Sequence, residues 1–243
     1  MPRLRHLNFI GEMRGRMVQA VIFDLDGTLV DTSQCHIAAW KKALSESGVK
    51  KSHREIRRQF GKSSEDIARS LLPSRIKRNA RIVAERKDDL FLEKGYESAE
   101  AIPGARKTLS SLKGKGMTIA VCSSNPRVTV ETLLKRFRLI RLVDVYVSMD
   151  EVRRGKPAPD ILLLAARGMG LQPSTILVVG DSVYDMAAGK SAGMRTAGVA
   201  SGASSFDELQ AQHPDFLLHR ITEVIPLIDK LSYARKQSDS EVR

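Results

Sequence analysis

The sequence is poor in several residue types that would point to particular classes of protein. It has only two cysteines, Cys35 and Cys122, far apart and without partners at metal-like spacing, so neither a disulfide framework nor a zinc site is expected. We therefore expect a reducing, cytoplasmic environment. Apolar runs stay well below the roughly 18 residues of a membrane span, and residues 1–17 lack the apolar centre of a secretory signal. No membrane association is expected.

Positive charge is the one excess in the composition. The chain carries 40 Lys and Arg against 28 Asp and Glu, a formal net charge of +12. Such an excess favours anionic ligands or nucleic acid. The most basic segment, residues 75–87, also continues an apolar stripe at helical spacing, and no aromatic residues interleave for base stacking. We therefore interpret it as the solvated face of an amphipathic helix, and nucleic acid is not an expected partner. The apolar positions of this stripe are Ile76, Ala80, Val83, Ala84, Leu90 and Phe91.

From residue 18 onward, the pattern changes from one strand to a helical stretch and then to regular alternation. The segment "VQAVIFD" is continuously apolar, as a central parallel strand requires. Strands separated by helices of about ten residues predict right-handed crossovers and a doubly wound parallel sheet, an α/β fold. The later strands are predicted at 117–123, 143–148, 175–181 and 195–200, with helices at 104–114, 127–137, 159–168, 183–191, 205–212 and 221–231.

The helical stretch predicts an inserted domain. Its helices are expected at 34–47, around 55–60, after an N-cap at 63–66, and from Pro73 to about Lys94. The predicted division is a core domain of residues 18–33 and 102–232 with a helical domain of residues 34–101 inserted. Residues 1–17 are expected to be a disordered or misassigned extension, and 233–243 a frayed polar tail.

Acidic and hydroxyl side chains follow the predicted strands at the points where those strands end. In "VIFDLDGTLVDT", Asp24 and Asp26 come directly after the first strand, and Asp181 with Asp185 follows a later one. In open parallel sheets, ligands bind outside the carboxyl ends of the strands. We therefore expect these groups, together with Ser123, to converge on one edge of the sheet.

Four segments, "DLDGTLVDT", "AVCSSN", "RGKPAPD" and "VGDSVYDM", resemble in this order the four motifs of the haloacid dehalogenase-like (HAD) hydrolase superfamily. The helical insert resembles its type 1 cap, and the resemblance spans residues 18 to about 231. The pattern is most similar to phosphoglycolate phosphatase and other small-metabolite phosphatases. β-Phosphoglucomutase shares the Rossmann-like core and cap, but it typically has adjacent Glu and Asp where this chain reads Gly180-Asp181-Ser182. A phosphomutase is therefore the alternative.

The resemblance implies catalysis by aspartate. Asp24 is the expected nucleophile: a carboxylate is ionised at neutral pH and can attack phosphorus to give an aspartyl-phosphate that water then hydrolyses. Asp26 would protonate the leaving oxygen and later accept a proton from water, for which we expect a raised pKa. Its presence favours phosphate esters over carbon–halogen substrates. Lys156 would offset the negative charge gathered at nucleophile and phosphate.

A divalent cation is the implied cofactor. Mg²⁺ prefers oxygen ligands and keeps several waters, so only a few protein groups are needed. By resemblance, these are the carboxylates of Asp24 and Asp181, the backbone carbonyl of Asp26, and Asp185 directly or through water. Helix capping is the alternative role for Asp181 when that residue is taken alone.

Phosphate and substrate contacts are assigned by the same resemblance. Leu25, Asp26 and Lys156 are expected to contact the phosphate, with the Ser123 hydroxyl and the Ser124 N–H, although a helix N-cap is the alternative for either serine. "FGKSSED" resembles the cap's substrate-specificity loop, with Gly61 for a tight turn and Lys62 for an anionic leaving group such as a carboxylate. A solvated loop lysine is equally consistent with the sequence at that point.

Two further residues of the first insert helix, His36 and Trp40, are expected to pack rather than to contact substrate. The expected function is thus Mg²⁺-dependent hydrolysis of a small phosphorylated metabolite, phosphoglycolate-like or a sugar phosphate. The expected protein is a monomer or homodimer without membrane or nucleic-acid partners.

Overall fold

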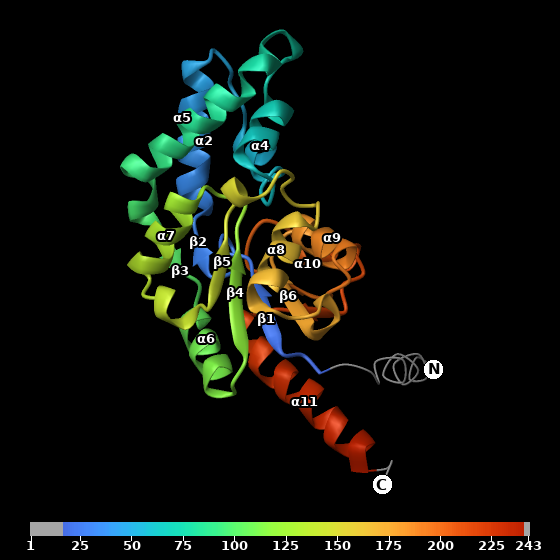
Figure 1. Cartoon of the computed structure of the whole chain (residues 1–243). Helices are drawn as coiled ribbons and strands as arrows, with labels where there is room; N and C mark the ends of the chain where they lie inside the picture. Colours follow the sequence, from blue (N-terminus) through green and yellow to red (C-terminus); the bar gives the residue numbers. More distant parts are fainter. Residues whose placement is uncertain (1–16, 241–243) are drawn as a thin grey trace.

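The computed structural model describes residues 17–240, so the predicted extension lies, apart from Met17, outside the described residues. Its core is a six-stranded sheet in the order β5-β4-β1-β6-β7-β8, and every pair of neighbouring strands is parallel. The crossovers between them confirm the predicted doubly wound α/β fold (Figure 1). The strands are β1 (Ala20–Phe23), β4 (Thr118–Cys122), β5 (Val145–Val147), β6 (Ile176–Gly180), β7 (Arg195–Val199) and β8 (Phe216–Leu218).

Alternate residues of the central strand face two separate apolar layers. Ala20 and Ile22 pack with α8 and α9, whereas Val21 and Phe23 pack with α6, α7 and the start of α11. Strand side chains alternate between faces, and all four are fully buried because helices cover both sides. The helices are α6 (Ala105–Gly114), α7 (Arg127–Arg136), α8 (Asp160–Met169), α9 (Val183–Ser191), α10 (Phe206–Gln210) and α11 (Val224–Ser240).

The helical insert follows β1 and lies beyond the carboxyl end of that strand (Figure 1). The expected helix from Pro73 to Lys94 differs in its first turns, which are 3₁₀ (η1) before α5 begins. The predicted apolar stripe is buried, with Ile76 half-buried at its edge. The insert consists of α2 (Ser33–Glu46), α3 (His53–Arg57), α4 (Ser64–Leu71), η1 (Ser74–Asn79), α5 (Ala80–Glu93) and η2 (Gly95–Ser98).

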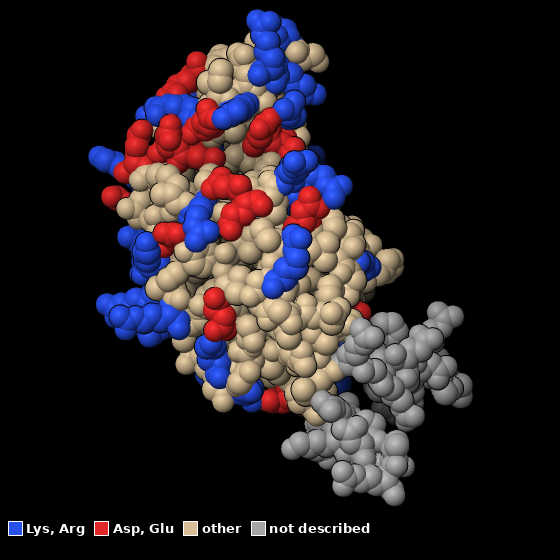
Figure 2. Space-filling view, in the orientation of Figure 1, with Lys and Arg blue, Asp and Glu red and all other residues tan. Residues whose placement is uncertain are grey.

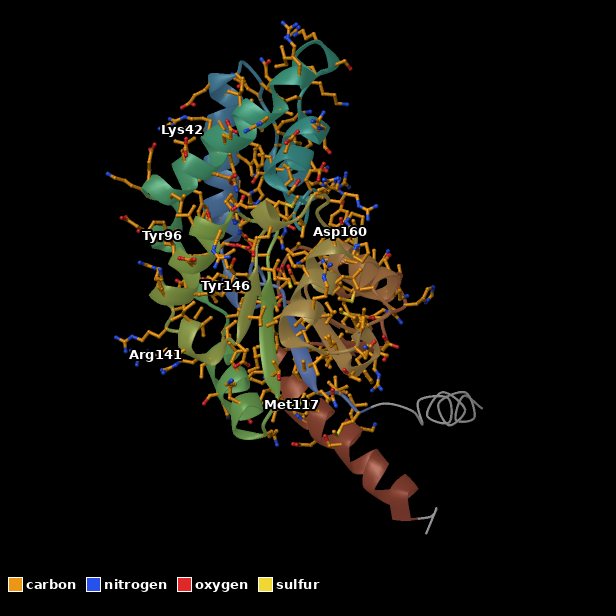
Figure 3. All side chains as sticks on the ribbon, in the orientation of Figure 1. Lys42, Tyr96, Met117, Arg141, Tyr146 and Asp160 are labelled. Atoms are coloured by element: carbon orange, nitrogen blue, oxygen red, sulfur yellow. The ribbon has the colours of Figure 1, made fainter. Side chains whose placement is uncertain are left out.

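Insert and core are joined by a small antiparallel pair that the sequence did not predict. β2 (Val30–Asp31) pairs with β3 (Glu100–Ala101), so the two connecting segments run side by side. Strands of two residues have no periodicity by which they can be recognised. Nearby, Tyr96 of the insert lies beside α7 (Figure 3), and the Arg136 guanidinium lies 5.7 Å from its ring centroid. The domain boundaries themselves stay a prediction.

The last described element is helical, and the frayed tail expected at 233–243 stays a prediction. A 3₁₀ turn, η6 (Ile221–Glu223), precedes α11, and the helix continues to Ser240. Residues 233–240 include Ala, Arg, Lys and Gln, which favour helix. Residues 241–243 lie outside the described part of the chain.

None of the helices within residues 17–240 has the length and apolar character needed to cross a membrane.

Charges of both signs intermingle on the visible face of the insert (Figure 2). The half-buried Arg86 pairs with the exposed Glu46 and Glu93, and Arg81 pairs with Glu85 at exposed positions. These pairs agree with a solvated helix face on α5. The absence of a nucleic-acid partner stays a prediction.

We expect the core to be sensitive to truncation on α7. Leu133 is fully buried, so Leu133→Ala should lower the free energy of unfolding by about 2–5 kcal/mol through lost burial and a residual cavity. Val128 on the same helix is 54% exposed, and Val128→Ala should change stability by less than about 0.5 kcal/mol. Urea unfolding followed by circular dichroism measures both, and equal effects would contradict this packing.

Candidate active site

Three carboxylates predicted to converge do lie together at the carboxyl edge of the sheet. Asp24 follows β1, Asp181 follows β6, and Asp185 stands in the first turn of α9. One carboxylate oxygen of each lies within 4.8 Å of the others, and both Asp181 and Asp185 are buried. Residues more than 150 positions apart in the chain therefore share one small volume.

Lys156 is buried among these carboxylates. Its Nζ donates to Asp24 Oδ1 at 2.6 Å and to the Cys122 carbonyl at 2.9 Å, and it lies 2.7 Å from Asp185 Oδ1. Burial alone would lower the pKa of Lys156, but Asp185 and Asp24 outweigh it and raise the pKa above the ordinary value. The ammonium thus stays charged and neutralises part of the acidic cluster.

The pKa values of Asp181 and Asp24 show how strongly the negative charge is concentrated. Burial, followed by the nearby Asp185 carboxylate, raises the pKa of Asp181 to about 7. Burial likewise raises the pKa of Asp24 well above its ordinary value, with Lys156 opposing and the other aspartates reinforcing the shift. One ammonium therefore does not offset the full charge of the cluster.

The donor set fits a hard divalent cation. The Asp185 Oδ1 atom is buried and accepts no hydrogen bond from the described residues, because the nearby Lys156 ammonium lies outside hydrogen-bond geometry. Carboxylate oxygens are the ligands Mg²⁺ prefers, and a cation among them would offset the repulsion. The carboxylates of Asp24, Asp181 and Asp185 are therefore the residues that could hold Mg²⁺; a role for the Asp26 carbonyl stays a prediction.

Local sequence explains how Asp185 is oriented. Ser182 caps α9: its hydroxyl accepts from the Asp185 N–H and donates to Asp185 Oδ2 at 2.6 Å. This capping box fixes one carboxylate oxygen and leaves the other to face Lys156. Because Ser182 supplies the cap, Asp181 is not needed for it. Asp181 instead accepts from the Thr28 hydroxyl and from the Ala203 N–H.

Asp26 lies at the junction of core and insert and accepts four hydrogen bonds. Thr32 Oγ1 (2.6 Å) and His36 Nε2 (3.0 Å) meet one oxygen, and Asn125 Nδ2 (2.6 Å) and Ser123 Oγ (3.3 Å) meet the other. Burial would raise the pKa of Asp26, but the bonds from His36 and Thr32 outweigh it and lower the pKa. The raised pKa expected from sequence is therefore wrong for this arrangement.

The predicted packing role for His36 is only part of what it does. Its ring stacks on Phe91 with centroids 4.3 Å apart, while Nε2 reaches Asp26. Burial, reinforced by the charge of Lys87, lowers the pKa of His36, so the ring is neutral and Nε2 carries the proton donated to Asp26. Spacing gave a usable signal, because Thr32 and His36 are four residues apart at the start of α2 and lie on one side of the helix.

Ser123, Ser124 and Leu25, which were also predicted to contact the phosphate, lie around this cluster and differ in which of their polar groups are already hydrogen-bonded. Ser123 Oγ faces Asp26, whereas Ser124 Oγ donates to the Gly61 carbonyl at 2.9 Å and so holds the segment 60–66 against the core. The Leu25 side chain is fully buried and its carbonyl accepts from the N–H of Leu29 and of Val30. A phosphate contact by Leu25 would therefore use its N–H.

A cavity of about 50 Å³ separates the acidic residues from the insert. Lys62 and Lys87 line it from the insert, together with Trp40. Gly61 has φ of +100°, a backbone conformation that L side chains avoid, so the tight turn expected there is present. Lys62 donates to Gln59 Oε1 at 2.9 Å and its Nζ lies 5.2 Å from the Tyr184 ring centroid.

Lys87 is a residue of this cavity that sequence reasoning missed. The residue is only 2% exposed, and its Nζ meets Asp88 Oδ1 at 2.9 Å while lying 5.6 Å from the Trp40 ring centroid. A signal existed: Lys87 falls four residues after Val83 and four before Phe91, within the buried stripe of α5. A lysine at an apolar-stripe position points into the protein.

The loop after β7 also contributes to the site without having been predicted. Ala203 N–H bonds Asp181, and Ser201 Oγ donates to the Gly27 carbonyl at 2.7 Å. Between them, a Cβ on Gly202 would overlap the Asp181 carboxylate and come within 2.7 Å of the Gly27 Cα. Only glycine allows this approach.

We expect Gly202→Ala to displace Asp181 and lower phosphatase kcat/KM at least about tenfold, the cost of losing roughly 1.4 kcal/mol of transition-state stabilisation. Gly114→Ala is the matched control, because a Cβ there meets no atom within 4 Å. Steady-state kinetics with p-nitrophenyl phosphate, beside thermal unfolding of both variants, measures the effect. Equal kcat/KM in the two variants would contradict the close packing of this loop on Asp181.

Comparison with known proteins agrees with this geometry. Residues 21–199 match the model of the haloacid dehalogenase-like hydrolase family. Pyrophosphatase PpaX of Bacillus velezensis is 30% identical over 220 residues, covering 88% of this chain and 97% of the relative. The "Probable phosphatase IndB" of Dickeya dadantii is 32% identical over 213 residues, with 86% and 93% covered. A hydrolase structure from Pseudomonas syringae has a TM-score of 0.79 at 27% identity, covering 87% of this chain and 98% of that one. The chain therefore belongs to the haloacid dehalogenase-like hydrolase family, as one of its phosphatases.

Proposed function

We propose that this phosphatase hydrolyses a small, multiply charged phosphorylated metabolite in a Mg²⁺-dependent reaction through an aspartyl-phosphate on Asp24. The contact between Lys156 Nζ and Asp24 Oδ1 at 2.6 Å, inside the cluster formed with Asp181 and Asp185, carries this proposal. A nucleophilic Asp24 carboxylate would thus act beside a buried positive charge. Such preorganised charge stabilises the transition state of phosphoryl transfer.

The first step forms a bond between an Asp24 carboxylate oxygen and phosphorus and breaks the bond from phosphorus to the leaving oxygen. The leaving group departs with the electron pair of that bond. A leaving phosphate is stable as an anion, whereas an alkoxide can take a proton from Asp26, in the same cavity, only when that carboxyl is protonated, which its lowered pKa opposes. In the second step, water attacks phosphorus, Asp26 accepts a proton from that water, and the Asp24 carboxylate is released with inorganic phosphate.

Mg²⁺ would be held by Asp24, Asp181 and Asp185, and when bound it supplies positive charge that offsets repulsion between carboxylates and phosphate. The protein's own part is to fix these ligands. Ser182 orients Asp185, and the Ala203 N–H with the Thr28 hydroxyl orients Asp181. Lys156 holds Asp24 in place.

The cavity supports a compact substrate with an anionic leaving group. The residues that line it include Asp24 and Asp26 on the core side and the basic residues Lys62 and Lys87 on the insert side. Phosphoglycolate, with a carboxylate, and inorganic pyrophosphate, with a second phosphate, both fit this chemistry. The name of the Bacillus velezensis relative favours pyrophosphate.

The phosphomutase alternative is weaker. The segment Gly180-Asp181-Ser182 departs from the adjacent Glu and Asp typical of β-phosphoglucomutase, and Gly180 lies tightly against the Asp185 side chain. Cytoplasmic location and a monomeric or dimeric state stay predictions.

We expect Asp24→Asn to reduce phosphate release from p-nitrophenyl phosphate by at least about 10³-fold, because an amide is a much weaker nucleophile than a carboxylate. Asp31→Asn is the matched control: Asp31 is exposed and accepts only from the Ser33 N–H in its neighbourhood. EDTA should abolish activity and added Mg²⁺ restore it. Full activity in Asp24→Asn would refute the nucleophile assignment.

We expect Lys87→Met to raise KM for pyrophosphate and phosphoglycolate at least about tenfold while changing KM for p-nitrophenyl phosphate much less, since the nitrophenyl leaving group carries no second anionic group. Lys94→Met, at the exposed C-cap of α5, should leave all three substrates unaffected. Parallel KM increases for all substrates would show that Lys87 acts through folding rather than recognition.

A further inference from the structure

Another cavity, of about 260 Å³, lies between the insert and the core beside the cavity of about 50 Å³ that the acidic residues line, the reaction cavity. We call it the arginine groove; the residues that line it are Arg54, Arg57, Arg58, Phe60, Val183, Tyr184, Ala203, Ser204 and Glu208. It shares only Phe60 and Ala203 with the reaction cavity, and none of the clustered aspartates lines it. The two cavities therefore adjoin at Phe60 and Ala203.

Short-range sequence order explains why three arginines meet there. Arg54, Arg57 and Arg58 stand at positions i, i+3 and i+4, which share one side of a helical turn. Ile56 is buried on another side, and the capping box between Ser52 and Glu55 fixes where the turn begins. The Arg57 guanidinium donates to the Gly202 carbonyl at 2.8 Å, so this side faces the core.

Within the described chain, the other two guanidiniums make no hydrogen bond and no ion pair. Arg57 donates to the Gly202 carbonyl, whereas the N–H donors of Arg54 and Arg58, which line the groove, have no acceptor among the described residues. The Ser204 hydroxyl accepts from the Val183 N–H and keeps its own proton to donate, and the Tyr184 phenol has no partner among the described residues. The groove thus presents an excess of donors and positive charge.

Glu208 is the one carboxylate that lines the groove, and it is already engaged. It accepts from the Ser205 N–H at 2.8 Å as part of the cap of α10. Hydrogen bonds from Ser205 lower the pKa of Glu208, and the charges of Arg58 and Arg57 add to this effect. One carboxylate against three guanidiniums leaves the groove net positive.

We propose that the arginine groove is a second anion-binding site, for inorganic phosphate or a small phosphorylated ligand other than the substrate. Guanidinium groups bind phosphate oxygens in paired geometry, and hydroxyl donors complete such a site. The groove, at about 260 Å³, is larger than the reaction cavity of about 50 Å³ and leaves room for a small anion.

A bound anion would contact both the insert and the core. Arg54 and Arg58 belong to the insert, whereas Tyr184 and Ser204 belong to the core. The site lies beside Gly202, whose loop supplies the Ala203 N–H to Asp181. A ligand that contacts both sides stabilises the arrangement in which they meet, and it does so by mass action.

The test counts inorganic phosphate bound per chain by equilibrium dialysis with radiolabelled phosphate and Mg²⁺, so it does not depend on turnover. Wild type should bind one more phosphate per chain than the Arg54→Gln/Arg58→Gln double variant. Arg75→Gln/Arg78→Gln, with the same change of charge at exposed positions of η1 outside the groove, should bind as wild type does. Equal counts in wild type and groove variant, or an equal loss in the control, would overturn the proposal.

Two single variants guard against an effect of misfolding. Glu208→Gln keeps a capping-box residue but removes the groove's negative charge, and should tighten phosphate binding about threefold, a gain that a misfolded protein cannot show. Tyr184→Phe keeps the ring beside Lys62 and should weaken binding. No tightening in Glu208→Gln would count against the site.

Kinetics distinguish a separate ligand from the remote end of a substrate. In Arg54→Gln/Arg58→Gln, hydrolysis of p-nitrophenyl phosphate and of pyrophosphate should both keep their wild-type KM. A rise of KM for pyrophosphate alone, with no change in the phosphate count, would assign the groove to the substrate and overturn a second site. Failure of the proposed function would instead show as absent hydrolysis in wild type.

Discussion

One buried ammonium among several buried carboxylates is the constraint on which the site depends. Lys156 lies within 2.7 Å of both Asp24 and Asp185, and Asp181 completes the cluster. Burial makes charged groups costly unless they are compensated, and the raised pKa values of Asp24 and Asp181 show that Lys156 compensates only part of the charge. The same incomplete compensation suits a divalent cation and, after it, a phosphate. Charge balance therefore links the stability of this edge of the sheet to its chemistry.

Asp26 connects that cluster to the insert. Thr32 and His36 approach it from the start of α2, while Ser123 and Asn125 approach from the loop after β4. The carboxylate is thus held by groups from both sides of the cavity. Motion of the insert relative to the core would change the hydrogen bonds of Asp26, and so the position of the insert and the proton chemistry of the site are physically coupled.

Much of the fold could be predicted because its signals are local and periodic. Apolar runs ending in aspartate identified β1 and β6, and the regular alternation of strands and helices predicted the helices between the later strands. The paired β2 and β3 could not be predicted, since two residues carry no period. Lys87 was not recognised as buried because it belongs to a strongly basic segment, most of which is exposed. Only its position on the apolar stripe of α5 distinguishes it from the exposed lysines and arginines. The pKa of Asp26 went against expectation because its four donors come from two segments about 90 residues apart, the start of α2 and the loop after β4.

The sequence by itself determined the order of strands and helices, the residues at the strand ends, and through its motifs the family. Those properties depend on neighbours within a few positions and on alternation that any chain of this pattern must follow. Only the tertiary structure decided which donors meet Asp26, that Gly202 lies against Asp181, and that α3 turns three arginines toward the core. Distances between side chains of remote segments follow from packing of the whole chain, and no local pattern encodes them.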